Sequence, residues 1–243
     1  EKALTDNLAQ ARELKAIADD AGLTFMVNYN YRYMETVVEL KQRIDAGEFG
    51  DLAFINICGH GYTFHHSIDL LRFLCGEIDT VQAMRTSNAR NLPVEDSAAV
   101  LLGFCSGALA AIALSDAVPS PWSWDLASGE NAAWPRNDVA THLIAGTDAS
   151  LSLPSLELWR YPGARGWAEK LARETLPHQQ ASPYERQIRH LCAVLRGAEA
   201  PLCGGRDAAR TLAATLAVHE AAAIGKRVQP HAVPAPPPTD ATA

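Results

Sequence analysis

The chain of 243 residues is long enough to form one large domain or two smaller ones with a substantial core. It is 48% hydrophobic and 20% charged, an ordinary globular balance, and its net charge of −7 disfavours a nucleic-acid or anionic-membrane surface. It contains no run of about 18 apolar residues that could span a membrane. Its five cysteines show neither C-x-x-C nor zinc spacing, which indicates reduced thiols in a cytoplasmic protein and no metal site.

The first thirty residues read as a helix followed by a strand. Leu8, Leu14 and Ile17 keep helical spacing, Thr5 is the candidate N-cap, and Gly22 ends the helix. The apolar segment 23–29 predicts a strand of the buried kind. This order is typical of the closing unit of a parallel α/β sheet, so we expect the chain to begin inside a larger fold.

A helix is expected from residue 33 to 47 and a strand from 52 to 57. In the next stretch, 65–77, Ile68, Leu71 and Leu74 are spaced three apart, which predicts a short buried helix that ends at Gly76. His65, His66 and Asp69 form a polar cluster at the other end of this helix. Because positions i and i+3 share a helix face, His66 and Asp69 are predicted neighbours.

An imidazole beside a carboxylate has its tautomer fixed and its basicity raised, as in a general base that works near neutral pH. His66 is therefore the candidate base of this helix. The alternative is that these polar groups only cap backbone amides at the start of the helix, because paired histidines also occur in structural networks.

The chain then becomes rich in strands. Strands are predicted at 80–86, 98–104, 108–115, 142–146, 150–153 and 156–161, with a hairpin turn at Ser106-Gly107. Residues 162–181 are expected to be irregular or weakly helical. Two helices are predicted at 183–197 and 206–224, and the segment 229–243, rich in Pro and Ala, is predicted to be disordered.

Five short motifs follow one another along the chain. They are Glu1-Lys2-Ala3-Leu4, Asn28-Tyr-Asn-Tyr-Arg32, Gly47-Glu-Phe-Gly50, His66-Ser-Ile-Asp-Leu-Leu-Arg72 and Glu220-Ala-Ala-Ala-Ile-Gly-Lys-Arg-Val228. In this order they resemble the glucose–fructose oxidoreductase/inositol dehydrogenase (Gfo/Idh/MocA) family, and the similarity covers residues 1–228.

The resemblance implies an α+β protein that acts as an NAD(P)-dependent oxidoreductase on a sugar, cyclitol or related hydroxy compound. Residues 1–32 would be the end of a Rossmann dinucleotide-binding domain, and 33–228 a substrate domain with a large, mostly antiparallel open sheet and helices on one face. Open sheets of this kind pair face to face, so a homodimer or homotetramer is expected. No G-x-G-x-x-G occurs in the 243 residues, so contacts to the pyrophosphate of NAD or NADP cannot be assigned.

The resemblance also implies roles for single residues. Lys2 would stabilise a developing alkoxide, His66 would exchange the proton of the substrate hydroxyl, and Asp69 would orient His66 or bind a sugar hydroxyl. Glu1, Lys2 and Arg32 are the candidate cofactor contacts, with a position at the domain junction as the alternative for Arg32. From its motif alone, Lys2 is a solvated lysine before a helix.

Four further side chains are candidates for substrate contact. They are Tyr62, His65, Trp122 and Trp124. Aromatic faces pack on the apolar C–H faces of sugar rings, which is the argument for the two tryptophans. The alternative for the two tryptophans is that they pin a loop to the sheet.

One stretch departs from the family pattern. Family members carry Asp or Asn four residues before the histidine and Gly two before it, where this chain has Tyr62 and Phe64. The short connection after Gly59 indicates either a deletion or an omitted loop.

A second hypothesis for the whole chain is a substrate-binding or oligomerisation module without cofactor or enzyme activity. Retention of Lys2, His66 and Asp69 favours the enzyme, and absence of the glycine loop favours the module.

Overall fold

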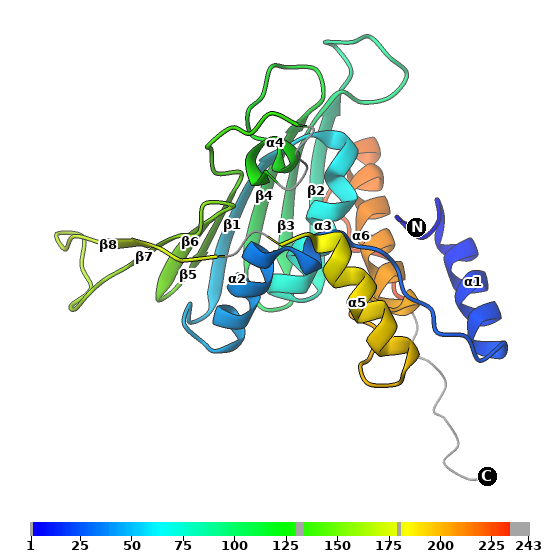
Figure 1. Ribbon diagram of the computed structural model, residues 1–243. Helices are drawn as coiled ribbons and strands as arrows, with labels where there is room; N and C mark the ends of the chain where they lie inside the picture. Colours follow the sequence, from blue (N-terminus) through cyan, green and yellow to red (C-terminus); the bar gives the residue numbers. More distant parts are fainter. Residues whose placement is uncertain (1, 130–133, 179–180, 234–243) are drawn as a thin grey trace.

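The computed structural model describes residues 2–129, 134–178 and 181–233 (Figure 1). In this part of the chain, eight strands form one open sheet in the order β2-β3-β4-β1-β5-β6-β7-β8. Only β1 and β4 are parallel neighbours there. The strands are β1 (Leu52–Gly59), β2 (Ile78–Thr86), β3 (Ser97–Phe104), β4 (Leu109–Ser115), β5 (His142–Gly146), β6 (Ala149–Leu153), β7 (Glu157–Arg160) and β8 (Ala172–Thr175). The predicted α+β fold with a mostly antiparallel open sheet is confirmed.

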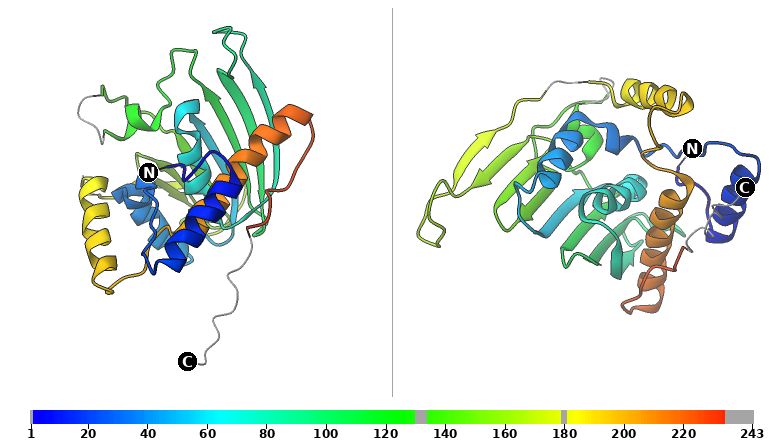
Figure 2. Two further views of the ribbon diagram at one scale, coloured as in Figure 1. Left: turned by 90° about the vertical axis from the view of Figure 1, so that its right-hand side faces the viewer. Right: turned by 90° about the horizontal axis from the view of Figure 1, so that it is seen from below.

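The helices cover one face of this sheet (Figure 2). They are α1 (Leu8–Asp20), α2 (Glu35–Asp45), α3 (Phe64–Cys75), α4 (Trp124–Ser128), α5 (Pro183–Leu195) and α6 (Gly205–Ile224), with short 3-10 turns η1 (Asn30–Tyr33) and η2 (Gly61–Thr63). Helix α1 packs on α6, where Ala11 meets Ala209 and Leu212. Within the described residues, no helix combines the length and the apolar character that a membrane span requires.

The core lies between the helices and the covered face of the sheet. Val100, Leu102 and Ile112 point into it and are at most 2% exposed, and α3 adds Ile68 and Leu71, which are fully buried. Alternation along each strand makes one face apolar and packed, as strand geometry requires. Helix α3 therefore packs most of its residues into this core.

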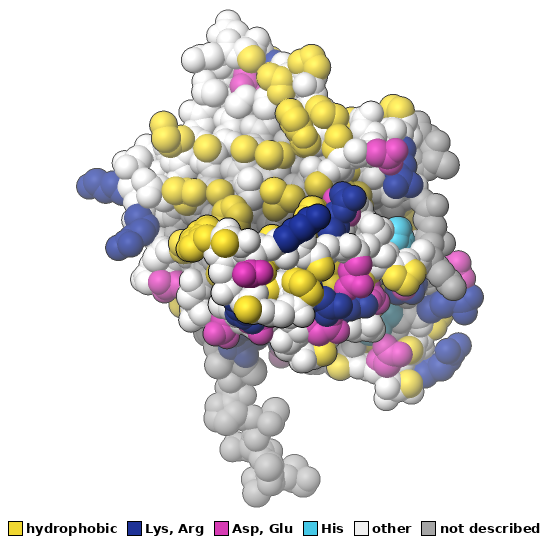
Figure 3. Space-filling view, turned by 90° about the vertical axis from the view of Figure 1, so that its left-hand side faces the viewer, with side chains coloured by type: hydrophobic (Ala, Val, Ile, Leu, Met, Phe, Trp, Pro, Cys, Tyr) yellow, Lys and Arg dark blue, Asp and Glu magenta, His cyan; other side chains and the backbone are white. Residues whose placement is uncertain are grey.

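The opposite face of the sheet is uncovered. Leu101 on β3 and Leu109 on β4 point from this face and are 57% and 60% exposed. We call this surface the open face, and by strand register its large apolar side chains are Phe54, Met84, Leu101, Leu109 and Leu143. Figure 3 shows hydrophobic side chains gathered in rows on one side of the molecule, with most charged side chains away from them.

The strand predicted at 23–29 is wrong. In the structure this segment makes one isolated bridge, between Met26 and Gly204, and the Val27 N–H donates to the carbonyl of Cys203 at 2.9 Å. A strand needs a neighbour along its length, and the described residues supply one at a single point. The segment instead buries Val27 and Tyr29 against the turn that leads into α6.

Two other local predictions need correction. The segment 162–181 was predicted to be irregular or weakly helical, but Ala172–Thr175 within it forms strand β8. All four residues of this strand are exposed, so they give no apolar alternation in the sequence. The N-cap of α1 is Asn7, whose side chain accepts from the Gln10 N–H at 2.9 Å, and not Thr5. Of the tail predicted to be disordered, residues 229–233 are described and carry no helix or strand, and 234–243 lie outside the described residues.

Candidate functional site

The candidate site is built at the N-terminal end of α3. The chain passes from β1 directly through η2 into α3. The Gly61 N–H donates to Oδ1 of Asp116 at 2.8 Å. A Cβ at position 61 would lie 2.7 Å from Oδ2 of the same carboxylate, so glycine allows this approach without a shift of the Asp116 side chain. The contact ties the start of α3 to the end of β4.

Lys2 contacts His65, the first histidine of α3. Its Nζ lies 3.1 Å from Nε2 of His65, which is half-buried. The rings of His65 and His66 are neighbours, with centroids 4.5 Å apart. Lys2, His65 and His66 therefore form one group at the end of the helix, which we call the histidine cluster.

His66 is the buried member of the histidine cluster. Its ring stacks on Tyr31 with centroids 4.5 Å apart and meets the edge of Tyr29 at 5.9 Å, and it is 5% exposed. Burial, followed by the charges of His65 and Lys2, lowers the pKa of His66 to about 3. Its Nδ1 is buried and has no hydrogen-bond partner among the described residues. His66 is thus a neutral imidazole held inside an aromatic wall.

The predicted contact between His66 and Asp69 is wrong. The Asp69 carboxylate is fully buried and accepts from Nε and Nη2 of Arg32 at 2.8 and 2.7 Å and from the hydroxyl of Thr211 at 2.9 Å. A buried carboxylate requires a paired cation, and a bidentate guanidinium satisfies it better than a neutral imidazole. These contacts favour a structural role for Asp69.

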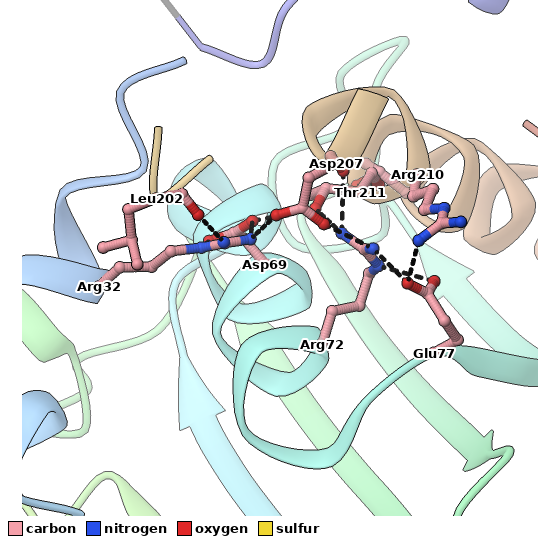
Figure 4. A network of polar contacts seen from close by, with 9 residues as sticks. Arg32, Asp69, Arg72, Glu77, Leu202, Asp207, Arg210 and Thr211 are labelled. Carbon is pink, nitrogen blue, oxygen red and sulfur yellow. Dashed lines mark hydrogen bonds and ion pairs between the residues drawn. The ribbon is translucent and has the colours of Figure 1, made fainter. Parts of the chain in front are cut away.

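Arg32 belongs to a larger polar network that joins η1, α3 and α6 (Figure 4). It also donates to the Leu202 carbonyl at 2.8 Å and pairs with Asp207 at 2.7 Å, so all three guanidinium nitrogens contact protein oxygens. Asp207 in turn pairs with Arg72 at 2.9 Å, and Arg72 with Glu77 at 2.8 Å. Arg32 offers no free nitrogen to a cofactor, and the alternative at the domain junction fits better. Sequence reasoning missed Asp207 and Arg72, although a charged residue within the apolar pattern of α3 was a signal.

The aromatic candidates separate into two groups. Trp124 is 3% exposed and its ring contacts Tyr31 at 5.3 Å and His142 at 5.2 Å, as expected of an indole that pins its loop. Trp122 is 48% exposed. The Tyr62 hydroxyl donates to Asp125, and burial together with this carboxylate raises the pKa of Tyr62 above its ordinary value. Trp122 and Tyr62 therefore remain accessible to a ligand, and Trp124 does not.

A pocket of about 330 Å³ opens beside the histidine cluster, between α3, α6 and strands β2–β4. Tyr62 and His65 line it, together with Glu95, Asp116 and His219, which sequence reasoning had missed. No sequence motif marks these three residues, because they come from a loop, a strand end and a helix that only the fold brings together. Among the described residues, no group of three or more His, Cys, Asp or Glu side chains is placed to hold a metal ion.

The described residues fit only part of a dinucleotide. Lys2 and His65 could meet a reacting oxygen and the ring beside it. The described helix N-termini lack the G-x-G-x-x-G turn that cradles a pyrophosphate, so these residues hold no phosphate site of that kind. Glu1, the other candidate contact, lies outside the described residues.

Comparison with known proteins agrees with this fold. The model of the GFO/IDH/MocA C-terminal domain family matches residues 61–150. The chain is 27% identical to D-apiose dehydrogenase of Paraburkholderia graminis, over 91% of this chain and 63% of that protein. The chain therefore spans less than two thirds of the length of this relative.

Two solved structures share the architecture. An oxidoreductase from Agrobacterium radiobacter, in complex with NAD+, L-tartaric acid and magnesium, has a TM-score of 0.73 at 19% identity, over 94% of this chain and 71% of that one. The WlbA dehydrogenase from Bordetella pertussis, in complex with NADH and UDP-GlcNAcA, has a TM-score of 0.70 at 17% identity, over 96% and 71%. With the family match at residues 61–150, these findings show that the chain is similar to oxidoreductases of the Gfo/Idh/MocA family and shares their C-terminal domain fold.

Proposed function

We propose that this chain supplies the substrate-binding and proton-transfer part of an NAD(P)-dependent oxidoreductase that acts on a sugar, cyclitol or related hydroxy compound. The observation that carries the proposal is the contact of Lys2 with His65, at the edge of a pocket, in the family's C-terminal fold. The relatives support the cofactor class, since two of them were solved with NAD+ and NADH.

The histidine cluster suits a substrate hydroxyl. An ammonium at Lys2 Nζ stabilises negative charge that develops on the substrate oxygen, and an imidazole beside it takes the hydroxyl proton. His66 was the candidate base by resemblance, but it is walled in by Tyr29 and Tyr31. His65 lines the pocket and touches Lys2, so the geometry favours His65 as the imidazole that meets the substrate, with His66 packed behind it.

The domain organisation belongs to the same proposal. Residues 1–32 correspond to the end of a dinucleotide-binding domain, and 33–228 to the substrate domain. The junction between them is held by Arg32, through Asp69 and Asp207. A cytoplasmic location is proposed because all five cysteines are free thiols.

Turnover tests the proposal directly. The full-length gene product should reduce NAD+ or NADP+ in the presence of a neutral sugar or cyclitol, and Lys2→Ala should lower kcat by roughly 10²-fold or more, because a preorganised charge at the developing alkoxide is lost. Exposed Lys170, replaced by Ala, is the matched control. A full-length protein that turns over none of a broad panel of hydroxy compounds with either cofactor would contradict the proposal.

The second candidate is a binding or oligomerisation module without cofactor. It is favoured by the absence of a pyrophosphate cradle in the described residues. We expect the 243-residue chain to bind NADH and NADPH negligibly in a calorimetric titration, since backbone amides at a glycine-rich helix start supply much of dinucleotide affinity. A dissociation constant in the low micromolar range would show that this chain holds a cofactor site that its sequence does not reveal.

A further inference from the structure

The pocket beside the histidine cluster has the size of a small-molecule site. Its volume is about 330 Å³, and ligand sites in proteins range upward from about 300 Å³. Much of its wall is apolar, supplied by Val94, Val100, Leu114, Val218 and Ala222. An apolar wall with a few polar groups suits a monosaccharide ring, which has C–H faces and hydroxyl edges. The space is too small for a nucleotide sugar to be enclosed.

The pocket is continuous with the proposed reactive group. His65 lines it and lies 3.1 Å from Lys2, and Tyr62 lines it one turn earlier. A molecule in the pocket therefore has one end at the histidine cluster. Its other end lies toward Glu95, Asp96 and Asp116, which line the same space.

These three carboxylates set the charge of the pocket. The Arg90 and Ala89 N–H groups and the Ser97 hydroxyl bond to Asp96 and lower the pKa of its carboxyl, so Asp96 is ionised at neutral pH. Oδ1 of Asp116 accepts a hydrogen bond from the Gly61 N–H and lies 3.4 Å from Nδ1 of His60. Hydroxyl groups can donate to carboxylates of this kind, whereas carboxylate or phosphate groups cannot.

The guanidinium that lines the pocket already forms an ion pair with a carboxylate. Arg85 is the one guanidinium that lines it among the described residues, and its Nη1 lies 3.0 Å from Glu95. His219 faces the same carboxylate at 3.7 Å. A second anion at this end would meet Glu95, Asp96 and Asp116 with no guanidinium left to pair it, and like charges in contact are strongly unfavourable.

We propose that this pocket selects uncharged monosaccharides or cyclitols and rejects sugar acids and sugar phosphates, with Asp116 and the Arg85–Glu95 pair as the residues that set this specificity. The inference rests on the proposed function, because it names the substrate class of the same site. It is separate from the question of cofactor, since the pocket lies wholly within the described chain.

Direct binding to the 243-residue chain tests this without cofactor or turnover. Saturation-transfer NMR and calorimetry would compare D-glucose and myo-inositol with D-glucuronate and D-glucose 6-phosphate. We expect the two uncharged probes to bind at least about tenfold more tightly than the two anions. Asp116→Asn keeps an acceptor oxygen for the Gly61 N–H and should narrow this ratio at least threefold, because it removes the repelling charge.

Two variants of α6 control for the place of binding. Ala222 lines the pocket and is half-buried, so Ala222→Phe should fill the space and abolish binding of D-glucose and myo-inositol. Its neighbour Ala223 is exposed and does not line the pocket, so Ala223→Phe should leave binding unchanged.

Each other outcome overturns the inference. Equal affinity for charged and uncharged probes, or a ratio unaffected by Asp116→Asn, would remove the proposed selectivity. Absence of all binding, or binding unaffected by Ala222→Phe, would show that the pocket is not the sugar site. None of these outcomes contradicts the oxidoreductase proposal, which is tested separately by turnover of the full-length protein with NAD+ or NADP+.

Discussion

His66 and His142 are buried imidazoles whose environments favour the neutral form. His66 is 5% exposed within the aromatic wall, and His142 is 3% exposed, with Nδ1 2.8 Å from the Thr141 hydroxyl. Burial lowers the pKa of each ring to about 3, whereas in the unfolded chain a histidine titrates near its ordinary value of about 6.5. Protonation therefore favours the unfolded state.

The free energy of unfolding should therefore fall as the pH is lowered. The stabilising effect of these two rings is complete above pH of about 6.5 and is lost progressively as the pH falls toward about 3. At pH 5 the loss should be about 2 kcal/mol for each ring, from 1.36 kcal/mol per pH unit. Urea unfolding at pH 7.5 and pH 5 measures it, and His142→Gln should reduce the difference. Equal stability at both pH values would mean that the rings are not sealed from water.

The two histidines of the cluster can be told apart by substitution. We expect His65→Ala to lower kcat of the full-length enzyme by roughly 10²-fold or more, because it removes the imidazole that lines the pocket. His66→Ala should mainly lower the free energy of unfolding, since it leaves a gap beside Tyr31. The matched measurement is kcat and the urea midpoint for both variants. If His66→Ala retains wild-type stability and loses turnover, His66 and not His65 is the base, and the assignment made here is contradicted.

At the scale of elements, the buried network of Arg32 holds η1, α3 and α6 together. Asp69→Asn removes the charge that Arg32 pairs with, and breaking a buried ion pair in this way costs about 3–5 kcal/mol. Glu174→Gln removes a surface partner of Arg160 and is the matched control, with an expected effect below about 1 kcal/mol. Chemical unfolding measures both. Similar small losses in the two variants would show that Asp207 alone suffices to hold Arg32.

Most elements could be predicted because their apolar spacing reflects burial on one side. Helix α3 and strands β1–β7 follow that rule, and their predicted positions agree with the structure to within a few residues. Strand β8 is exposed on both faces, so nothing in Ala172–Thr175 signals it. The segment 23–29 is apolar because Val27 and Tyr29 are buried, yet burial alone does not make a strand.

The site was harder to predict than the fold, because its contacts are remote in sequence. Spacing on a helix placed Asp69 beside His66, but it could not show that Arg32, 37 residues earlier, takes the carboxylate. The contact of Lys2 with His65 joins residues 63 apart in the chain. The sequence pointed to the residue types at this end of α3, and only the fold shows which member pairs with which.

At the scale of the whole molecule, the open face predicts association. Phe54, Leu101 and Leu109 are each about half exposed and lie on neighbouring strands β1, β3 and β4. A contiguous apolar patch of several hundred Å² is rarely left in water, so we expect a homodimer or homotetramer through this face. Light scattering at tens of micromolar measures the mass.

Substitutions locate the interface. Leu101→Glu places a charge at the centre of the open face and should yield monomers, because burying that charge in a partner's apolar surface is unfavourable. Ile188→Glu, at a position on α5 that is 58% exposed and away from the sheet, is the control and should not change the mass. A wild-type chain that is monomeric at tens of micromolar would contradict the prediction.

The central place of β1 has a consequence for how the chain reaches its structure. β1 precedes the other strands of this sheet in the chain, yet both of its neighbours, β4 and β5, are far along the chain. The other pairings join consecutive strands, so β2–β4 and β5–β8 can each form as a meander from nearby residues. Neither meander touches the other across the sheet until β1 is placed between them. Closing these two long loops is the step with the largest entropic cost, so the docking of β1 should limit the folding rate.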